Sequence, residues 1–206
     1  MPENLPIYSD SVLRSRLQFA DLEKLKSIDP EPIWIKSDGF IEQMEGASGI
    51  ARARSRVVQP SKDSLLEIHS IIFSGQAGAG KLRASSPAPL YRGHDCPPSE
   101  FVNRSLDNLF RWLDAESFAE IHPIEKSALV LLRVADIWPF EFGNLTTAIV
   151  FANVFLRNAG LTPFFVLPAH AREFNAVIAQ AMSIDTQPLV SAIHKTIKRE
   201  LEAIGQ

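Results

Sequence analysis

Apolar residues recur every three or four positions over most of this chain, a spacing that favours amphipathic helices. These stripes cover residues 11–28, 38–46, 62–73, 99–113, 123–137, 144–158, 169–183 and 188–204. Pro, Gly or short polar segments separate neighbouring stripes, as expected where helices begin and end. The pattern therefore predicts an all-α fold.

The stretch from Ile137 to Ile149 interrupts this pattern between its two most apolar segments. Pro139 cannot lie in a helix interior, and Gly143 permits backbone conformations that other residues resist. One helix is therefore predicted to end near Trp138 and the next to begin near Asn144, with a tight loop between them. The first amides of that second helix have no intrahelical acceptor, so the loop is a candidate cradle for an anion.

A glycine-rich stretch follows the predicted helix at 62–73. Residues 75–81 read G-x-x-x-x-G-K, the phosphate-loop pattern without its final Ser or Thr. That loop needs a β-strand before it and a helix after it, whereas a helical pattern precedes it here and Pro87 and Pro89 follow. We interpret it as a glycine turn that leaves a helix, and we expect the nearby His69 to be a packed residue rather than a ligand.

Residues 83–98 are the main non-helical region of the chain. Leu90-Tyr91-Arg92 fits a short strand between Pro89 and Gly93, so a small β-hairpin is predicted there.

The composition is that of an ordinary globular protein, with 206 residues of which 46% are apolar and 22% charged. The net charge of −3 argues against nucleic acid or an anionic membrane as a partner. The single Cys96 cannot form an internal disulfide, which suits a reducing compartment. The chain opens without a signal-peptide pattern, and the apolar run at 148–156 is too short to cross a bilayer. We therefore expect a cytoplasmic protein. The sequence does not indicate its oligomeric state.

Several features, in their order and spacing over residues 38–204, resemble the Fic (Fic/Doc) family. They are Gly80-Lys81-Leu82-Arg83, the hairpin-like stretch, Pro97-Pro98, His122-Pro123, the loop at 138–144, the stop at 158–160 and Pro188-Leu189. The resemblance implies an all-α helical bundle with a small β-hairpin flap over its site. It also implies a relation to enzymes that mostly move AMP from ATP, with Mg²⁺, onto a hydroxyl of a target protein; some use other nucleotide-like donors.

The family's motif, H-x-F-x-(D/E)-G-N-G-R-x-x-R, aligns with residues 138–149. Phe140, Gly143 and Asn144 match it. The His, the acid, the second Gly and the two Arg are replaced by Trp138, Phe142, Leu145, Thr146 and Ile149 respectively. The resemblance leaves Gly143, Asn144 and Leu145 as a remnant of the phosphate-binding loop.

Each replacement removes a group that the family's chemistry requires. Indole has no basic nitrogen, so Trp138 cannot act as the general base. Phe142 offers no oxygen to Mg²⁺, and Leu145 adds a Cβ where backbone should approach phosphate. Thr146 and Ile149 leave the polyphosphate charge without arginines. We therefore expect no ATP, Mg²⁺ or other metal at this site, and we expect Trp138 to plug the pocket.

Many family members carry an inhibitory helix with the pattern (S/T)-x-x-x-E-(G/N), whose Glu pairs with the second motif arginine. Glu45 and Gly46 keep this spacing here, with Ile41 at the Ser/Thr position, although so short a match can be coincidental. Glu45 would have lost its partner, because the second arginine is absent. We divide the chain into N-terminal helices at 1–60, including this inhibitory relic, and a Fic-like core domain at 61–206.

The resemblance and the losses together favour a catalytically inactive Fic-fold protein that acts as a binding or regulatory module, with a protein partner at the flap. The alternative is an enzyme with altered chemistry on a nucleotide or phosphorylated metabolite, held by the amides at 143–145. Asp136, Glu141 or His94 would then supply the base, and Glu141 could also replace the acid lost at 142. An unrelated all-α interaction protein is the third interpretation.

Overall fold

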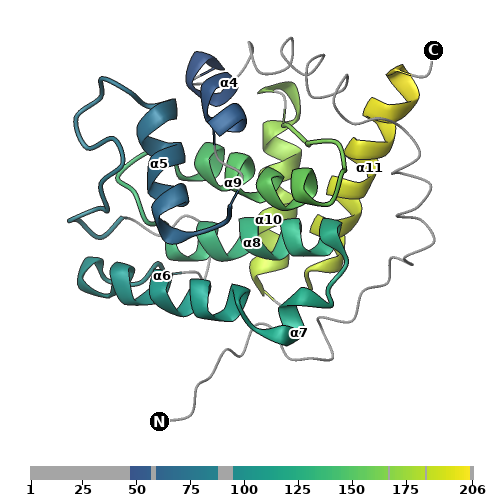
Figure 1. The fold of residues 1–206 in the computed structure, drawn as a ribbon. Helices are drawn as coiled ribbons and strands as arrows, with labels where there is room; N and C mark the ends of the chain where they lie inside the picture. Colours follow the sequence, from purple (N-terminus) through teal and green to yellow (C-terminus); the bar gives the residue numbers. More distant parts are fainter. Residues whose placement is uncertain (1–46, 57–58, 88–94, 167, 184, 205–206) are drawn as a thin grey trace.

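The computed structural model describes residues 47–56, 59–87, 95–166, 168–183 and 185–204. Within these ranges every regular element is a helix, which confirms the predicted all-α fold (Figure 1). The helices are α4 (Ala47–Arg56), α5 (Lys62–Ile72), α6 (Ser99–Leu113), α7 (Glu116–Ala119), α8 (Pro123–Ile137), α9 (Asn144–Asn158), the 3₁₀ helix η1 (Pro168–His170), α10 (Ala171–Ser183) and α11 (Gln187–Ile204). No described helix combines the length and the apolar character that crossing a membrane requires.

Some predicted elements lie outside the described residues. These are the helices before residue 47 and the short strand at 90–92 of the hairpin flap. Residues 83–87, which precede the predicted hairpin strand, contain neither helix nor strand. The division of the chain at residue 60 stays a prediction, although α4 packs against both α5 and α9.

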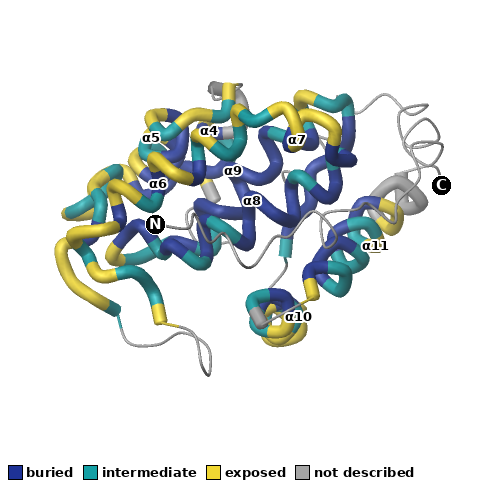
Figure 2. Tube along the Cα trace, turned by 90° about the horizontal axis from the view of Figure 1, so that it is seen from below, coloured by how far each residue is buried: buried dark blue, intermediate teal, exposed yellow. Residues whose placement is uncertain are grey.

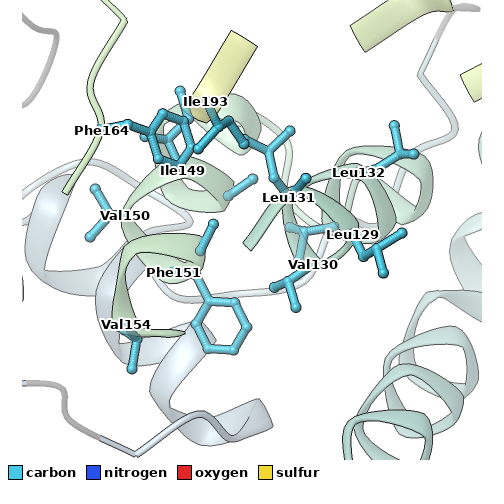
Figure 3. Close-up of a cluster of buried hydrophobic side chains, with 14 of the residues drawn as sticks. Leu129, Val130, Leu131, Leu132, Ile149, Val150, Phe151, Val154, Phe164 and Ile193 are labelled. Carbon is cyan, nitrogen blue, oxygen red and sulfur yellow. The ribbon is translucent and has the colours of Figure 1, made fainter. Parts of the chain in front are cut away.

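Helices α8 and α9 form the centre of the fold. Figure 2 shows them between α4 and α5 on one side and α10 and α11 on the other. Residues 128–132 of α8 and 148–154 of α9 are all buried (Figure 2). A helix that is apolar on nearly every side must be covered on every side, which agrees with the central position of α8. Figure 3 shows side chains of α8, α9, α11 and the segment 161–166 gathered in one apolar cluster.

Local sequence sets the helix starts. At the start of α5, the Ser64 amide donates to the Ser61 hydroxyl, and the Ser61 amide donates to the Ser64 hydroxyl. At the start of α8, Pro123 occupies the first turn, where its missing N–H costs nothing. The ring of His122 accepts the Ile124 amide at 3.2 Å. The predicted starts near residues 62 and 123 are therefore confirmed.

Helix α4 meets the end of α5 through Gly49. A Cβ at this position would lie 2.3 Å from the Ile72 Cα and 2.5 Å from the Ile72 carbonyl oxygen. Both are backbone atoms, which cannot swing aside as a side chain can. Ile50 and Ala53 of the same helix are fully buried. The missing side chain at 49 therefore lets two helix backbones touch.

The substitution Gly49→Ala should lower the free energy of unfolding by about 1–3 kcal/mol, because the added methyl group overpacks this contact. Urea unfolding followed by circular dichroism measures the change. The matched control is Ser48→Ala, an exposed neighbour, for which a change below about 0.5 kcal/mol is expected. Equal stabilities for the two variants would contradict the backbone-to-backbone packing of α4 on α5.

Candidate functional site

Residues 138–144, which we call the signature loop, connect α8 to α9. Trp138 follows α8 in the left-handed conformation, with φ 49° and ψ 62°, which is uncommon for a bulky residue. Gly143 takes φ 66° immediately before α9. The predicted end of one helix near Trp138 and the start of the next near Asn144 are both confirmed.

Asn144 closes the signature loop on itself. Its Oδ1 accepts the Phe140 amide and its Nδ2 donates to the Phe140 carbonyl, both at 2.8 Å. Both residues are buried, so water does not compete for either bond. Asparagine carries the donor and the acceptor side by side, which an ionised aspartate or an apolar residue does not. Residue 144 therefore fixes the shape of the loop.

His69 of α5 joins the signature loop to the glycine turn, residues 75–80. The Gly80 amide donates to Nδ1 at 2.8 Å, so Nδ1 is the acceptor nitrogen. Nε2 lies 3.1 Å from the Phe142 carbonyl oxygen and therefore carries the proton. The ring also stacks on Phe140, with centroids 3.9 Å apart. Burial lowers the pKa of His69, partly offset by the Phe142 carbonyl. The prediction of a packed residue is confirmed.

Phe73 and Phe142 complete an aromatic cluster with His69 and Phe140. The rings of Phe73 and Phe142 meet edge to face, with centroids 5.2 Å apart. Phe73 also lies against Gly143, where a Cβ would stand 2.1 Å from its ring. Position 142 thus contributes aromatic packing where the family motif has an acid, and position 143 must be glycine for steric as well as conformational reasons.

Arg83 attaches the segment after the glycine turn to the signature loop. Its amide donates to the Pro139 carbonyl at 2.9 Å, and its Nε donates to the Trp138 carbonyl at 2.7 Å. Two other nitrogens donate to the carbonyls of Ser85 and Pro97. A cation thus satisfies a carbonyl at the C-terminal end of α8, where it also suits the helix dipole. No local pattern signals this contact, because residues 83 and 138 are 55 positions apart.

Glu141 contacts the same segment with its exposed carboxylate. Its Oε1 accepts the amides of Ala84 and Ser85 at 2.9 and 3.1 Å, and its Oε2 accepts the Ser85 hydroxyl at 2.6 Å. These donors, the hydroxyl first, hold the pKa of Glu141 below its ordinary value, and the charge of Arg83 acts in the same direction. The carboxylate is therefore bound to residues 84–85.

The remaining motif positions differ in burial. Ile149 is 5% exposed and belongs to the core, and Leu145 packs against that core from a half-buried position. Thr146 and Trp138 are half-buried. Phe142 packs its ring within the aromatic cluster of the loop. That Trp138 plugs the pocket stays a prediction.

The other two candidate bases are placed differently. Asp136 forms an ion pair with Arg133 one turn earlier on α8, with Nη1 and Oδ2 3.3 Å apart. His94 lies outside the described residues. In the described ranges, no group of three or more His, Cys, Asp and Glu side chains could hold a metal ion.

The glycine turn is not a phosphate loop. It follows helix α5 rather than a strand, and no helix follows it over residues 81–87. The Gly80 amide, which a phosphate loop would offer to its ligand, donates to His69 instead. The interpretation as a turn that leaves a helix is confirmed.

The predicted inhibitory relic at 45–46 lies outside the described residues. In α4, which follows it, a nitrogen of Arg52 donates to the Ile71 carbonyl at 3.4 Å.

Residues 59–156 match the Fic/DOC family. Protein adenylyltransferase fic-1 of Caenorhabditis elegans is 31% identical over 139 residues, which are 66% of this chain and 27% of that protein. Protein adenylyltransferase Fic of Nematostella vectensis is 25% identical over 153 residues, 72% of this chain and 36% of that protein. The chain thus spans a minor part of the length of each relative.

Solved structures show the same fold. Fic-1 (residues 134–508) from C. elegans is 25% identical with a TM-score of 0.64, over 78% of this chain and 50% of that one. A Fic-domain-containing signalling protein from Bacteroides thetaiotaomicron has a TM-score of 0.72 at 14% identity, over 89% of this chain and 93% of that one. The described helices therefore follow the all-α Fic fold.

The substitution Gly143→Ala should cost about 1–3 kcal/mol of stability from overpacking against Phe73, in addition to about 1–2 kcal/mol for the left-handed backbone. In a Phe73→Ala background the overpacking disappears, so only the conformational cost should remain. A double-mutant cycle of urea unfolding measures the difference. The same cost in both backgrounds would contradict the contact between Phe73 and Gly143.

The stability of the protein should fall as the pH drops below 6.5, the ordinary pKa of histidine, because the unfolded chain then binds a proton that the buried neutral His69 does not. The free energy of unfolding continues to fall until the pH reaches the lowered pKa of His69 in the folded protein, and His69 causes no further loss below that pH. The free energy of unfolding at pH 7.5 and 5.0 should differ more for the native chain than for His69→Asn. Equal pH dependence in both proteins would contradict the neutral tautomer.

Proposed function

The chain belongs to the Fic/DOC family through residues 59–156, and we propose that it is a binding or regulatory module on an AMP-transferase fold, without the family's AMP transfer. One observation carries the proposal. The residues that hold the loop's shape, Phe140, Gly143 and Asn144, are kept, while apolar residues or threonine occupy the positions that would do the chemistry.

The general base is the first missing group. The indole of Trp138 can donate a hydrogen bond but cannot take a proton from an attacking hydroxyl. General base catalysis typically contributes about 10²–10⁴ in rate. Of the candidate substitutes, Asp136 is paired with Arg133, and Glu141 accepts three hydrogen bonds from residues 84–85. Both carboxylates thus have structural partners.

The residues present do not fit magnesium-bound ATP. A hard cation needs oxygen ligands, whereas Phe142 packs its ring against Phe73 and His69. Polyphosphate needs compensating positive charge, whereas Thr146 is neutral and Ile149 lies in the core. The guanidinium of Arg83 is held by backbone carbonyls. These contacts favour the module over an enzyme with altered transfer chemistry.

Titration of the purified chain with ATP, ADP and Mg²⁺ should leave its melting temperature unchanged, and labelled ATP should transfer nothing to protein. A ligand at a hundred times its dissociation constant would stabilise the fold by about 2.7 kcal/mol, which a melting curve detects readily. A nucleotide-dependent rise in melting temperature, or label on protein, would refute the proposal and favour the enzyme.

A restored variant provides the contrast for this titration. The combination Trp138→His, Phe142→Asp, Leu145→Gly and Thr146→Arg returns four groups without placing a charge in the core, where Ile149 lies. It should respond to ATP and Mg²⁺ more strongly than the native chain. Trp138→His alone should stay silent, because the metal and phosphate ligands would still be missing; a response from this single variant would show that the other losses matter little.

A further inference from the structure

Arg83 carries a buried positive charge that no carboxylate in the described ranges contacts directly. Its side chain is 3% exposed, and its guanidinium nitrogens donate to backbone carbonyls. The acceptors belong to Trp138, Ser85, Pro97 and Ile137. Neutral carbonyls satisfy the hydrogen bonds but bring no full negative charge. The positive charge of Arg83 acts on the Glu141 carboxylate, whose pKa it helps to lower. An anion beside residues 84–85 is therefore attracted to Arg83.

Three hydrogen-bond donors converge just beyond this charge. They are the amides of Ala84 and Ser85, 2.9 and 3.1 Å from one oxygen of Glu141, and the Ser85 hydroxyl, 2.6 Å from the other. Successive amides that face one oxygen form a concave receptor for anions. Ala84, Ser85 and Glu141 are all exposed, so a group from solution can reach this place.

We propose that residues 83–85 form a binding site for a phosphate group, which the protein closes with its own Glu141 carboxylate. Glu141 already occupies the site as an oxyanion would, with one oxygen on the two amides and the other on the hydroxyl. A phosphate monoester presents the same pair of oxygens and carries more negative charge at neutral pH. The positive charge of Arg83 therefore favours phosphate over a free carboxylate.

Displacement of Glu141 would change only part of the contact between this segment and the signature loop. The three bonds to Glu141 would be lost, whereas the bonds from Arg83 to Pro139 and Trp138 are independent of it. Phosphate binding would thus release the Glu141 side chain and leave the loop in place. This site is separate from the amides at 143–145, and it does not depend on whether the chain is an enzyme.

When Glu141 occupies the site, phosphate can bind only to the fraction of molecules in which the site is open. The apparent affinity for phosphate is the intrinsic affinity multiplied by that fraction. Removing it with Glu141→Ala should therefore strengthen phosphate binding about tenfold or more. Inorganic phosphate is added to the ¹⁵N-labelled full chain at constant ionic strength, and the amide resonances of Ala84 and Ser85 are followed. The control Glu67→Ala removes an exposed carboxylate of α5 and should behave as the native chain does. Acetate should bind Glu141→Ala more weakly than phosphate does.

Absence of a saturable shift at Ala84 and Ser85 in Glu141→Ala would overturn the proposal, and so would equal affinities in the native chain, Glu141→Ala and Glu67→Ala. Should Glu141→Ala not fold, Glu141→Gln serves instead, because it keeps the side-chain length and loses only the charge and one acceptor. Its affinity should lie above that of the native chain, and equality would overturn the proposal. Phosphate shifts confined to residues 143–145 would count against both this site and the proposed loss of family chemistry.

Discussion

The two hydrogen bonds of the His69 ring are the interaction on which the arrangement of the candidate site depends. The ring accepts the Gly80 amide and donates to the Phe142 carbonyl. It therefore joins the glycine turn after α5 to the signature loop before α9, two segments that are far apart in the sequence. Both bonds need the neutral ring with its proton on Nε2, and burial favours the neutral ring. A protonated ring would turn a donor toward the Gly80 amide, so the burial of His69 and the shape of the site depend on each other.

The shape of the signature loop is thus independent of the chemistry its family performs. In the described part of the chain, side chains of His69, Arg83, Asn144 and Thr147 form hydrogen bonds to the backbone of the loop, and the loop's own Glu141 binds residues 84–85. None of these residues stands at a position where this sequence departs from the family motif. The replaced positions contribute packing instead, with Phe142 in the aromatic cluster and Ile149 in the core. The residues that fix the shape of the loop are therefore different from the positions to which the family motif assigns the transfer chemistry.

The sequence predicts local features of this site well and its long-range contacts poorly. Pro139 and Gly143 act on their own backbone, so the ends of α8 and α9 could be placed from them. The partners of Arg83 and Glu141 could not be predicted, because nothing in the sequence near a polar side chain indicates a hydrogen-bonding partner more than fifty positions away. Because Glu141 adjoins position 142 in sequence, the sequence makes it a candidate substitute for the metal ligand of the family motif. In the structure its carboxylate is held by residues 84–85, since successive side chains in a tight loop need not face the same way.

We propose that the loop at the start of α9 keeps its shape and does not receive nucleotide. The backbone amide resonances of Gly143, Asn144 and Leu145 in the ¹⁵N-labelled full chain, followed during titration with magnesium-bound ATP, test this. These three amides should stay unchanged at millimolar nucleotide, while the pattern of a folded protein persists. A saturable movement of the three amides, larger than that of amides elsewhere, would show that the remnant still binds phosphate and would contradict this proposal.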